Sequence, residues 1–330
     1  MRFTDELTSQ IVAAASAAPS IHNTQPWQFE QVGDELRLHG AHGQALWVSD
    51  PAARGLYISC GAALFNARLA ARIVGLDTTV LRLPHPDYPF DVLAVMRPRE
   101  AQPPGAAISP LYQSIWKRHT DRRPYSSRKI PHVLAVALQK AARAEAGHLR
   151  FLDRKETSIV LKLGDQAGLE LAADPAHQGE LRQHMGDTSA DAMPGSAMPL
   201  PPQHAPSPVR DDDFLSAAPW VSGVRAAYER HPQLGVLTTE RDEPQDWLRA
   251  GEALQHVLLV ATLNGLSASF LYQEIERDDM RDEGERSWPW PEHPQMILRL
   301  GYGLGALPTP RRSSADIMQS GESMRLPAGP

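Results

Sequence analysis

The sequence predicts an α+β fold in which helices surround mixed or antiparallel sheets and the same unit occurs twice along one chain. Three observations lead to this expectation. The chain has 330 residues, which is long for a single compact core. Segments with apolar residues three and four apart alternate with short apolar runs, a pattern typical of sheets covered by helices. One helix and strand pattern from the first third of the chain also recurs near its end.

The repeat is visible directly in the sequence. Residues 61–76 read GAALFNARLAARIVGL and residues 251–266 read GEALQHVLLVATLNGL, so Gly, Ala, Leu, Leu, Ala, Gly and Leu coincide without gaps. In each copy a β-rich stretch follows, and later a His-Pro pair precedes an apolar strand. The copies predict a first half, residues 1–105, and a second half, residues 106–330. The alternative interpretation is a chance likeness between two helices rich in small residues.

The other elements follow from local patterns taken in chain order. Helical periodicity predicts helices near residues 5–17, 54–75, 131–145, 155–173 and 246–264. Val32-Gly33-Asp34 supplies the turn of a hairpin over residues 28–38. Apolar or alternating runs predict further strands at residues 77–83, 91–96, 148–152, 267–272 and 295–300.

A proline-rich insertion interrupts the second half. Periodicity is lost over residues 186–213, where prolines recur at short intervals. Proline removes backbone donors and prevents regular ladders. Loops of this length within a compact domain are typically lids or segments without fixed structure. The insertion is therefore either a lid over a site or an extension without a role.

Composition and charge exclude several classes of protein. The net charge of −6 argues against nucleic-acid binding, which needs a basic surface. Cys60 is the only cysteine, so no disulfide within the chain and no cysteine-based metal site is expected, and no histidine pair has metal-binding spacing. No run of 18 apolar residues predicts a membrane span, and residues 1–10 do not resemble a signal peptide. A cytoplasmic protein is expected.

Two polar stretches carry the candidate chemistry. The first, residues 18–29, reads APSIHNTQPWQF and forms a loop that could present N–H groups and an amide to a planar ligand. The second, residues 116–125, reads WKRHTDRRPY and gathers basic side chains around a threonine hydroxyl. Forked guanidinium donors suit a phosphate. The alternatives are a structural turn for the first stretch and a solvated basic turn for the second.

Together the two stretches resemble the FMN-dependent nitroreductase family. In that family an Arg-Arg/His-Ser/Thr-x-Arg/Lys motif binds the phosphate, and a Pro-Ser-x-x-Asn-x-Gln-Pro-Trp loop meets the flavin across a dimer interface. Here the loop reads PSIHNTQPW from Pro19 to Trp27, and the phosphate motif reads RHTDR from Arg118 to Arg122. The order differs from the family pattern, because the loop precedes the phosphate motif.

The reversed order agrees with the repeat. A nitroreductase dimer takes the phosphate motif from one subunit and the loop from the other. In this chain the first half supplies the loop and the second half supplies the phosphate motif. The resemblance therefore implies one complete FMN site and a degenerate mate, as in the Acg-like branch of the family, where one chain imitates the dimer. A monomer is expected.

The resemblance implies cofactor-binding roles for residues of the loop, the phosphate motif, the stretch after the second repeat and the C-terminal basic pair. These residues are Pro19, Ser20, His22, Asn23, Gln25, Arg118, His119, Thr120, Arg122, Phe270, Leu271, Tyr272, Gln273, Arg311 and Arg312. The backbone of residues 270–273 would lie near flavin N5. Arg311 and Arg312 would face the FMN phosphate or, alternatively, be solvated tail charges. His22 would contact the ring or face water, and no catalytic side chain is assigned.

Two functions follow from the resemblance. The first is an FMN-dependent oxidoreductase that takes a hydride from NAD(P)H and reduces a small acceptor such as a nitro or quinone compound. The second is FMN storage or sequestration during stress or dormancy, with the insertion as a closed lid and little nicotinamide turnover. Flavin chemistry is supplied by the cofactor, while the protein binds it, orients it and tunes its potential.

Overall fold

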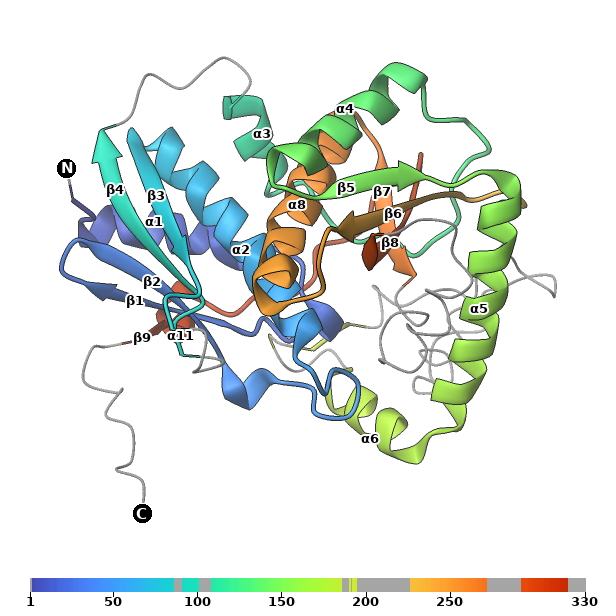
Figure 1. The fold of residues 1–330 in the computed structure, drawn as a ribbon, viewed down its shortest axis with the longest axis horizontal. Coiled ribbons are helices and arrows are strands. Elements are labelled where there is room, and N and C mark those ends of the chain that lie inside the picture. Colours follow the sequence, from blue (N-terminus) through green and yellow to red (C-terminus); the bar gives the residue numbers. More distant parts are fainter. Residues whose placement is uncertain are drawn as a thin grey trace.

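The computed structural model describes residues 2–85, 91–100, 108–185, 190, 192–194, 226–271 and 292–319. In Figure 1 two sheets stand on either side of a central pair of helices, α2 and α8. The elements of the first half are α1 (Asp5–Ser16), β1 (Trp27–Val32), β2 (Glu35–Gly40), α2 (Arg54–Ile73), β3 (Leu76–Arg82) and β4 (Ala94–Glu100). Short 3-10 turns, η1 (Ile21–Asn23) and η2 (His42–Gln44), flank the hairpin.

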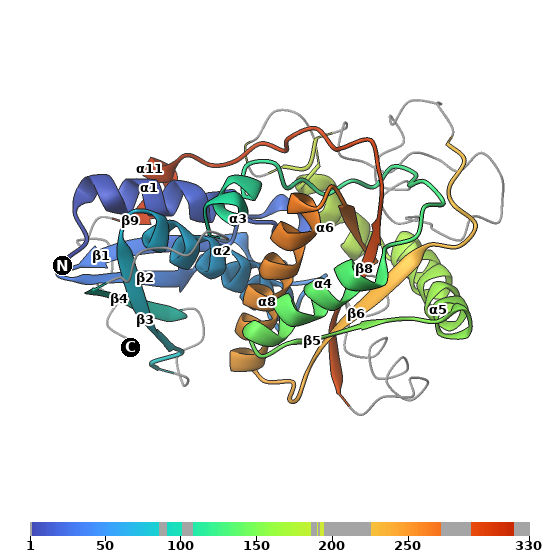
Figure 2. The same cartoon turned by 90° about the horizontal axis from the view of Figure 1, so that it is seen from above.

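The remaining described elements belong to the second half. In chain order these are α3 (Ile108–Ser114), α4 (His132–Ala144), β5 (His148–Phe151), α5 (Arg154–Ala173), α6 (Pro175–Gln183), β6 (Gln233–Thr239), α8 (Pro244–Leu263), β7 (Ser267–Leu271), β8 (His293–Gly301), α11 (Ser314–Ile317) and β9 (Met318–Gln319). Seen from above, α1 lies along β1 and β2, while α5 stands at the opposite end of the molecule (Figure 2).

The two sheets share one strand order. The first runs β3-β4-β2-β1-β9 and the second runs β7-β8-β6-β5. Apart from β9, each is antiparallel. The first follows the succession helix, two strands, helix and two strands, and the second follows it too except that α5 and α6 separate β5 from β6. Strand β9 pairs in parallel with β1, with Met318 opposite Phe29, so the C-terminal segment completes the sheet of the first half. The α+β architecture predicted from the sequence is therefore confirmed.

Most predicted elements lie within two residues of the observed ones. The predicted strand at 91–96 was wrong in its bounds, because β4 spans Ala94–Glu100 and pairs with β3 from Leu76 to Arg82. Helices α3, α6 and α11 and strands β6 and β9 were not predicted. Strand β6 is buried almost throughout, so its sequence, QLGVLTT, lacks the alternation that marks a half-exposed strand. Most of the proline-rich insertion, residues 186–213, lies outside the described residues.

Helices α2 and α8 cross at two glycines that occupy the first position of the two repeats. A Cβ on Gly61 would lie 2.0 Å from the carbonyl oxygen of Leu248, and one on Gly251 would lie 2.0 Å from that of Ile58. Gly61 and Gly251 are 190 positions apart, and so are Ile58 and Leu248. Each glycine therefore meets the same position of the opposite helix. The helix backbones touch here, and no larger residue fits.

The crossing joins two hydrophobic cores. The core of the first half contains Leu248 and Leu259 of α8, and the core of the second half contains Ile58 of α2. Each central helix therefore contributes apolar side chains to the core of the opposite half. Burial of such side chains is the main favourable term in folding, so the halves are stabilised as one unit.

A network of ion pairs also connects the halves. Glu252 of α8 is fully buried and accepts hydrogen bonds from Arg68 Nη1 at 2.6 Å and Arg82 Nε at 2.6 Å. Arg68 Nη1 also lies 2.6 Å from Glu145, which follows α4. Both arginines belong to the first half and both carboxylates to the second. Opposite charges therefore meet across the boundary between the halves.

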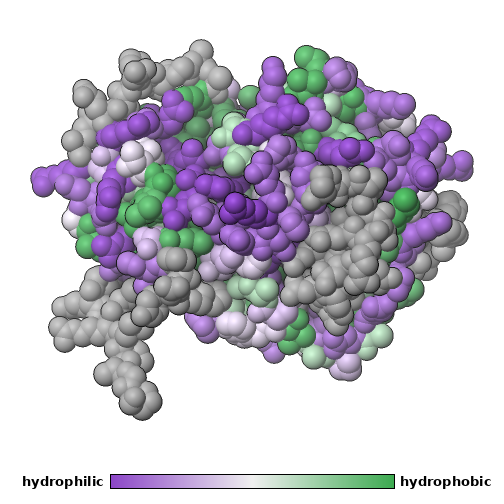
Figure 3. Space-filling model, in the orientation of Figure 1, coloured by the Kyte–Doolittle hydropathy of each residue, from purple (hydrophilic) through white to green (hydrophobic). Residues whose placement is uncertain are grey.

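The described surface is mostly polar. In Figure 3 hydrophilic residues predominate on the visible face, and the apolar residues form small separate patches. Among the described residues, no helix combines the length and the apolar character that a membrane span requires.

We expect Gly61→Ala to destabilise the fold, because its Cβ would collide with the backbone of α8. Overpacking of this kind costs about 3 kcal/mol of unfolding free energy. The matched control is Gly179→Ala, also in a helix, where a Cβ meets nothing within 4 Å. That change should be neutral or stabilise by up to about 1 kcal/mol. Urea unfolding measures both, and equal effects would contradict the close crossing.

Candidate functional site

Four segments distant in sequence meet beside the central helices. The loop after α1 lies against the phosphate motif, because Arg118 Nη2 donates to the carbonyl of Ala17 at 3.4 Å. The C-terminal segment reaches the same loop through Arg311 Nη1, 2.7 Å from Asn23 Oδ1. The fourth segment, β7, forms a parallel bridge between Ala268 and Thr120. The structure thus brings together the segments that the sequence singled out.

The loop is held in an unusual backbone conformation. His22, Asn23 and Gln25 all have positive φ, at 44°, 62° and 50°. Non-glycine residues adopt this region rarely, and clusters of them occur at functional sites that the surrounding structure supports. Support comes partly from Ser20, whose Oγ accepts from Gln25 N at 3.0 Å.

Helix α2 fixes the same loop from beneath. Ser59 Oγ accepts a hydrogen bond from Ile21 N at 3.1 Å and donates to Gly55 O at 2.6 Å. The Cys60 thiol is buried and lies 3.2 Å from the carbonyl oxygen of Pro26. Ser59 was not identified from the sequence, since a serine within an apolar helix has no pattern that separates it from a core position.

Arg118, His119 and Arg311 form a cationic cluster. Arg118 is only 4% exposed, and burial together with the charge of Arg311 lowers its pKa to about 9. Burial lowers the pKa of Arg311 to about 10. His119 has its pKa lowered to about 4 by burial and by the charges of Arg118 and Arg311. Both arginines remain protonated at neutral pH, so two cations are held close together at a cost in free energy.

Among the residues that the structure describes, no carboxylate pairs with Arg118 or Arg311. Their Nε atoms are buried and find no hydrogen-bond partner among these residues. Buried charges are ordinarily paired, and an unmet buried donor costs about 1–3 kcal/mol. The donor set, two guanidinium groups with a histidine close to both, suits a multiply charged oxyanion.

The rest of the basic stretch has other partners. Arg123 Nε lies 2.9 Å from Asp121 Oδ1, and its Nη2 lies 3.1 Å from Asp121 Oδ2, so Arg123 is neutralised by its neighbour. Arg122 is half-buried, and its carbonyl accepts from Tyr228 Oη at 3.2 Å. Of the basic residues in this stretch, Arg118 is the one buried at the contact with the loop.

The two amides of the loop are engaged by carbonyls of the insertion. Asn23 Nδ2 donates to Ala192 O at 2.9 Å and to Pro310 O at 3.2 Å. Gln25 Nε2 donates to Ala190 O at 2.7 Å, and its Oε1 accepts from the backbone N–H of Arg312 at 2.8 Å. The described part of the insertion therefore lies directly on the loop.

The remaining predicted residues are placed as follows. Pro19 and His22 are buried in the loop. The Arg312 guanidinium turns away to donate to Asp316 O at 2.9 Å. Phe270 packs on the core of the second half, and the Leu271 side chain is buried in a separate cluster under α5. Their backbone therefore remains the part of β7 that could face a ligand, while Tyr272 and Gln273 lie outside the described residues.

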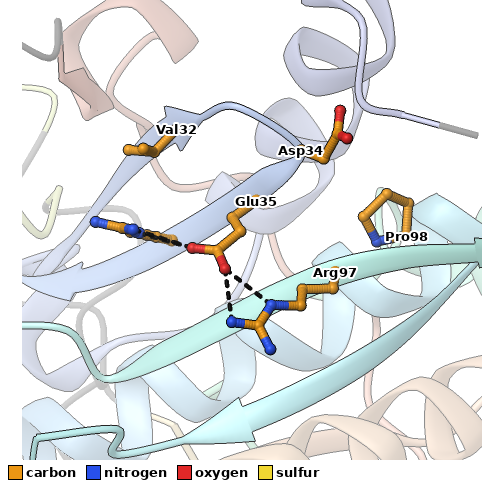
Figure 4. Close-up of a pocket in the computed structure, with 6 residues that line it drawn as sticks. Val32, Asp34, Glu35, Arg97 and Pro98 are labelled. Carbon is orange, nitrogen blue, oxygen red and sulfur yellow. Dashed lines mark hydrogen bonds and ion pairs between the residues drawn. The ribbon is translucent and has the colours of Figure 1, made fainter.

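A shallow pocket at the β1–β2 hairpin is not part of this arrangement. Figure 4 shows Glu35 between two arginine side chains, with Arg97 on β4. Glu35 Oε2 lies 3.0 Å from Arg37 Nη2, and Glu35 Oε1 lies 2.7 Å from Arg97 Nη2. Hydrogen bonds from Arg97 and then Arg37 lower the Glu35 pKa. None of its lining residues belongs to the four segments. Within the described residues no cluster of His, Cys, Asp or Glu could hold a metal ion.

Comparison with known proteins gives relatives over nearly the whole chain. The Mycobacterium tuberculosis protein Rv3131 is 31% identical over 97% of this chain and 93% of its own length. Its name gives it provisionally as an NAD(P)H nitroreductase. The M. tuberculosis protein acg, named in the same provisional way, is 26% identical over 90% of this chain and 89% of its own length. No family model matches the chain.

Similarity to solved structures is lower. A nitroreductase from Bacteroides fragilis, with bound FMN, is 15% identical with a TM-score of 0.35, and the match covers 61% of this chain and 93% of that one. A nitroreductase from Desulfitobacterium hafniense, also with bound FMN, is 14% identical with a TM-score of 0.38 and coverage of 64% and 97%.

The lowered pKa of His119 predicts a pH dependence of stability in the cofactor-free chain. Between pH 6.5, its ordinary pKa, and pH 4, the unfolded chain binds a proton that the folded chain does not. Folded stability therefore falls as the pH falls through this window. His119→Gln should lose less stability than the unchanged chain between pH 7 and pH 4, as measured by urea unfolding. An unchanged pH profile would show that His119 is not held neutral.

Proposed function

Because the chain belongs to the nitroreductase family, we propose that it binds one FMN between its halves and uses it as an oxidoreductase. The observation that carries the proposal is the pair of charged arginines, Arg118 and Arg311, with His119 beside them. The Nε atoms of both arginines are buried without a hydrogen-bond partner, and neither arginine has a carboxylate partner among the described residues. A phosphate monoester would supply the negative charge that this cluster lacks and acceptor oxygens for its two unmet Nε donors.

The residues present fit an FMN phosphate. Arg118, Thr120 and Arg311 would hold it. The buried Nε–H groups of both arginines have no acceptor among the described residues and could donate to phosphate oxygens. Arg122 would assist from the end of the motif. The flavin ring would lie along the loop, where the amides of Asn23 and Gln25 would bond its polar edge after exchanging their contacts with the carbonyls of Ala192 and Ala190. The β7 backbone, bridged to Thr120 through Ala268, would extend the site toward the ring.

We propose that the chain imitates a two-subunit enzyme. The loop comes from residues 1–105 and the phosphate cluster from residues 106–330. The shared strand order of the two sheets and the matching contacts of Gly61 and Gly251 support this division. In such an arrangement a monomer carries a complete site.

Bound FMN would supply the redox chemistry, accepting a hydride from NAD(P)H and passing electrons to a small acceptor such as a nitro or quinone compound. The protein would orient the ring and fix the phosphate. No side-chain acid or base is required for these steps, and we assign none. The strained loop and the buried cluster are preorganised groups, which lowers the cost of ordering them when the cofactor binds.

A second candidate, storage or sequestration of FMN, is favoured by one observation. The amides of Asn23 and Gln25 donate to the carbonyls of Ala192 and Ala190, so the insertion lies over the loop. If the insertion stays in place with FMN bound, nicotinamide would reach the flavin slowly. The two candidates differ in turnover and share the same cofactor.

We expect Arg118→Met to weaken FMN binding by at least about tenfold, because hydrogen bonds to charged groups contribute about 1.5–3 kcal/mol. The control is Lys117→Met, an exposed cation next to it in sequence, which should change affinity little. Titration of the cofactor-free protein with FMN, followed by flavin fluorescence, measures both. Failure of the unaltered chain to bind FMN would overturn the proposal.

The two functions are separated by an anaerobic visible spectrum of the FMN-loaded protein after NADPH is added. Rapid bleaching supports a reductase. A spectrum that persists with NADPH but bleaches with dithionite supports sequestration. Deletion of residues 190–210 removes the carbonyls that engage Asn23 and Gln25. Under sequestration this deletion should accelerate bleaching by NADPH. An unchanged rate would show that the insertion does not restrict access of nicotinamide to the flavin.

A further inference from the structure

A buried arginine lies behind the phosphate motif. Arg299, on β8, has no exposed surface, and its guanidinium forms a two-pronged contact with Glu229. Arg299 Nε lies 2.7 Å from Glu229 Oε1, and Nη2 lies 2.8 Å from Glu229 Oε2. Burial alone would lower the pKa of Arg299, but the hydrogen bonds and charge of Glu229 outweigh burial and raise it. The Arg299 guanidinium is therefore held in its charged form beside the Glu229 carboxylate.

The pair makes several contacts with the segment that follows the phosphate motif. Arg299 Nη2 donates to the carbonyl of Arg123 at 3.1 Å, and Glu229 Oε2 accepts from Tyr125 N at 3.0 Å. The Arg299 guanidinium stacks on the Tyr125 ring, 3.8 Å from its centroid. Tyr125 Oη in turn donates to the carbonyl of Asp121 at 2.6 Å.

Two features make this packing specific. A Cβ on Gly301 would lie 2.7 Å from Tyr125 Cδ2, so the ring is pressed against bare β8 backbone. The Arg299 residue is also opposite Ser269 in the β7–β8 register, and its Nη1 lies 3.4 Å from Ser269 Oγ. Ser269 directly follows Ala268, the residue bridged to Thr120. One side chain thus contacts both the phosphate segment and β7.

Desolvation makes such a pair costly. Replacement of a buried ion pair by apolar residues of similar volume is often neutral or stabilising, so the pair is weak evidence for a role in stability alone. Its bonds go instead to the backbone of Arg123 and Tyr125 and to the Ser269 hydroxyl of β7, which belong to two segments of the site. A planar guanidinium with fixed donor directions is suited to hold such backbone groups in one geometry.

We propose that Arg299 and Glu229 form a positioning pair that sets the phosphate motif against β7. None of the contacts given above joins the pair to Arg118, His119 or Arg311 of the proposed phosphate cluster. It acts by fixing the chain that carries Arg118, His119 and Thr120 relative to the strand along which the flavin would lie. This inference rests on the proposed binding of FMN.

The test compares FMN with riboflavin, which has the same ring and no phosphate. A pair that positions the phosphate motif should affect the part of the affinity that comes from the phosphate. Arg299→Lys keeps the charge and loses the forked geometry, and Glu229→Gln keeps the shape and loses the charge. We expect each to weaken FMN binding about tenfold or more and riboflavin binding only slightly. The exposed pair Arg150 and Glu156 supplies the control, Arg150→Lys.

A double variant guards against misfolding. Arg299→Met with Glu229→Met removes both charges together and should fold, because neither is left unpaired. If the unaltered chain prefers FMN over riboflavin by about a hundredfold, we expect this preference to fall to about tenfold or less in the double variant. An unaltered chain that binds FMN and riboflavin equally would overturn the proposed phosphate site. If the unaltered chain prefers FMN and all three variants keep the same preference, the positioning role alone would be overturned.

Discussion

The close approach of α2 and α8 is the contact that joins the two sheets and their cores. Because Gly61 and Gly251 leave no room for a side chain, the two helix backbones touch, and each presses on a carbonyl of the other. The sheets are then fixed on opposite sides of one helix pair, as Figure 1 shows. The end of α1 and its loop reach the segment that precedes α4, so Ala17 meets Arg118. A site composed from two distant parts of the chain follows from this crossing.

The two halves share a topology but differ in charge where they meet. Ala17, at the C-terminal end of α1, contacts a cationic cluster that has no carboxylate partner among the described residues. At the equivalent end of α4, Glu145 pairs with Arg68, which also contacts Glu252. One boundary is therefore neutralised by the protein itself, and the other would be completed by the anion of the proposed site. This asymmetry would give a physical reason for one cofactor site in a chain with two similar halves.

Local pattern was enough to predict the α+β class, the main helices and the hairpin, since these depend on spacing that the sequence displays. The loop and phosphate motif were found through their family resemblance, and the structure places them together. Contacts made by backbone could not be predicted, such as Ala192 O with Asn23. Arg299 was also missed, because a fully buried strand shows no alternation and a single arginine within QMILRL gives no sign of its partner, Glu229. Such partners are set by tertiary packing.

The number of FMN molecules bound per chain is the most direct measure of a single site assembled within the chain. Native mass spectrometry of the FMN-saturated protein reports both the oligomeric state and the cofactor count. A single site assembled within the chain predicts a monomer with one FMN. Two FMN per chain would contradict the asymmetry between the boundaries at Ala17 and Glu145, and FMN bound only by a dimer would show that the halves do not complete the site on their own.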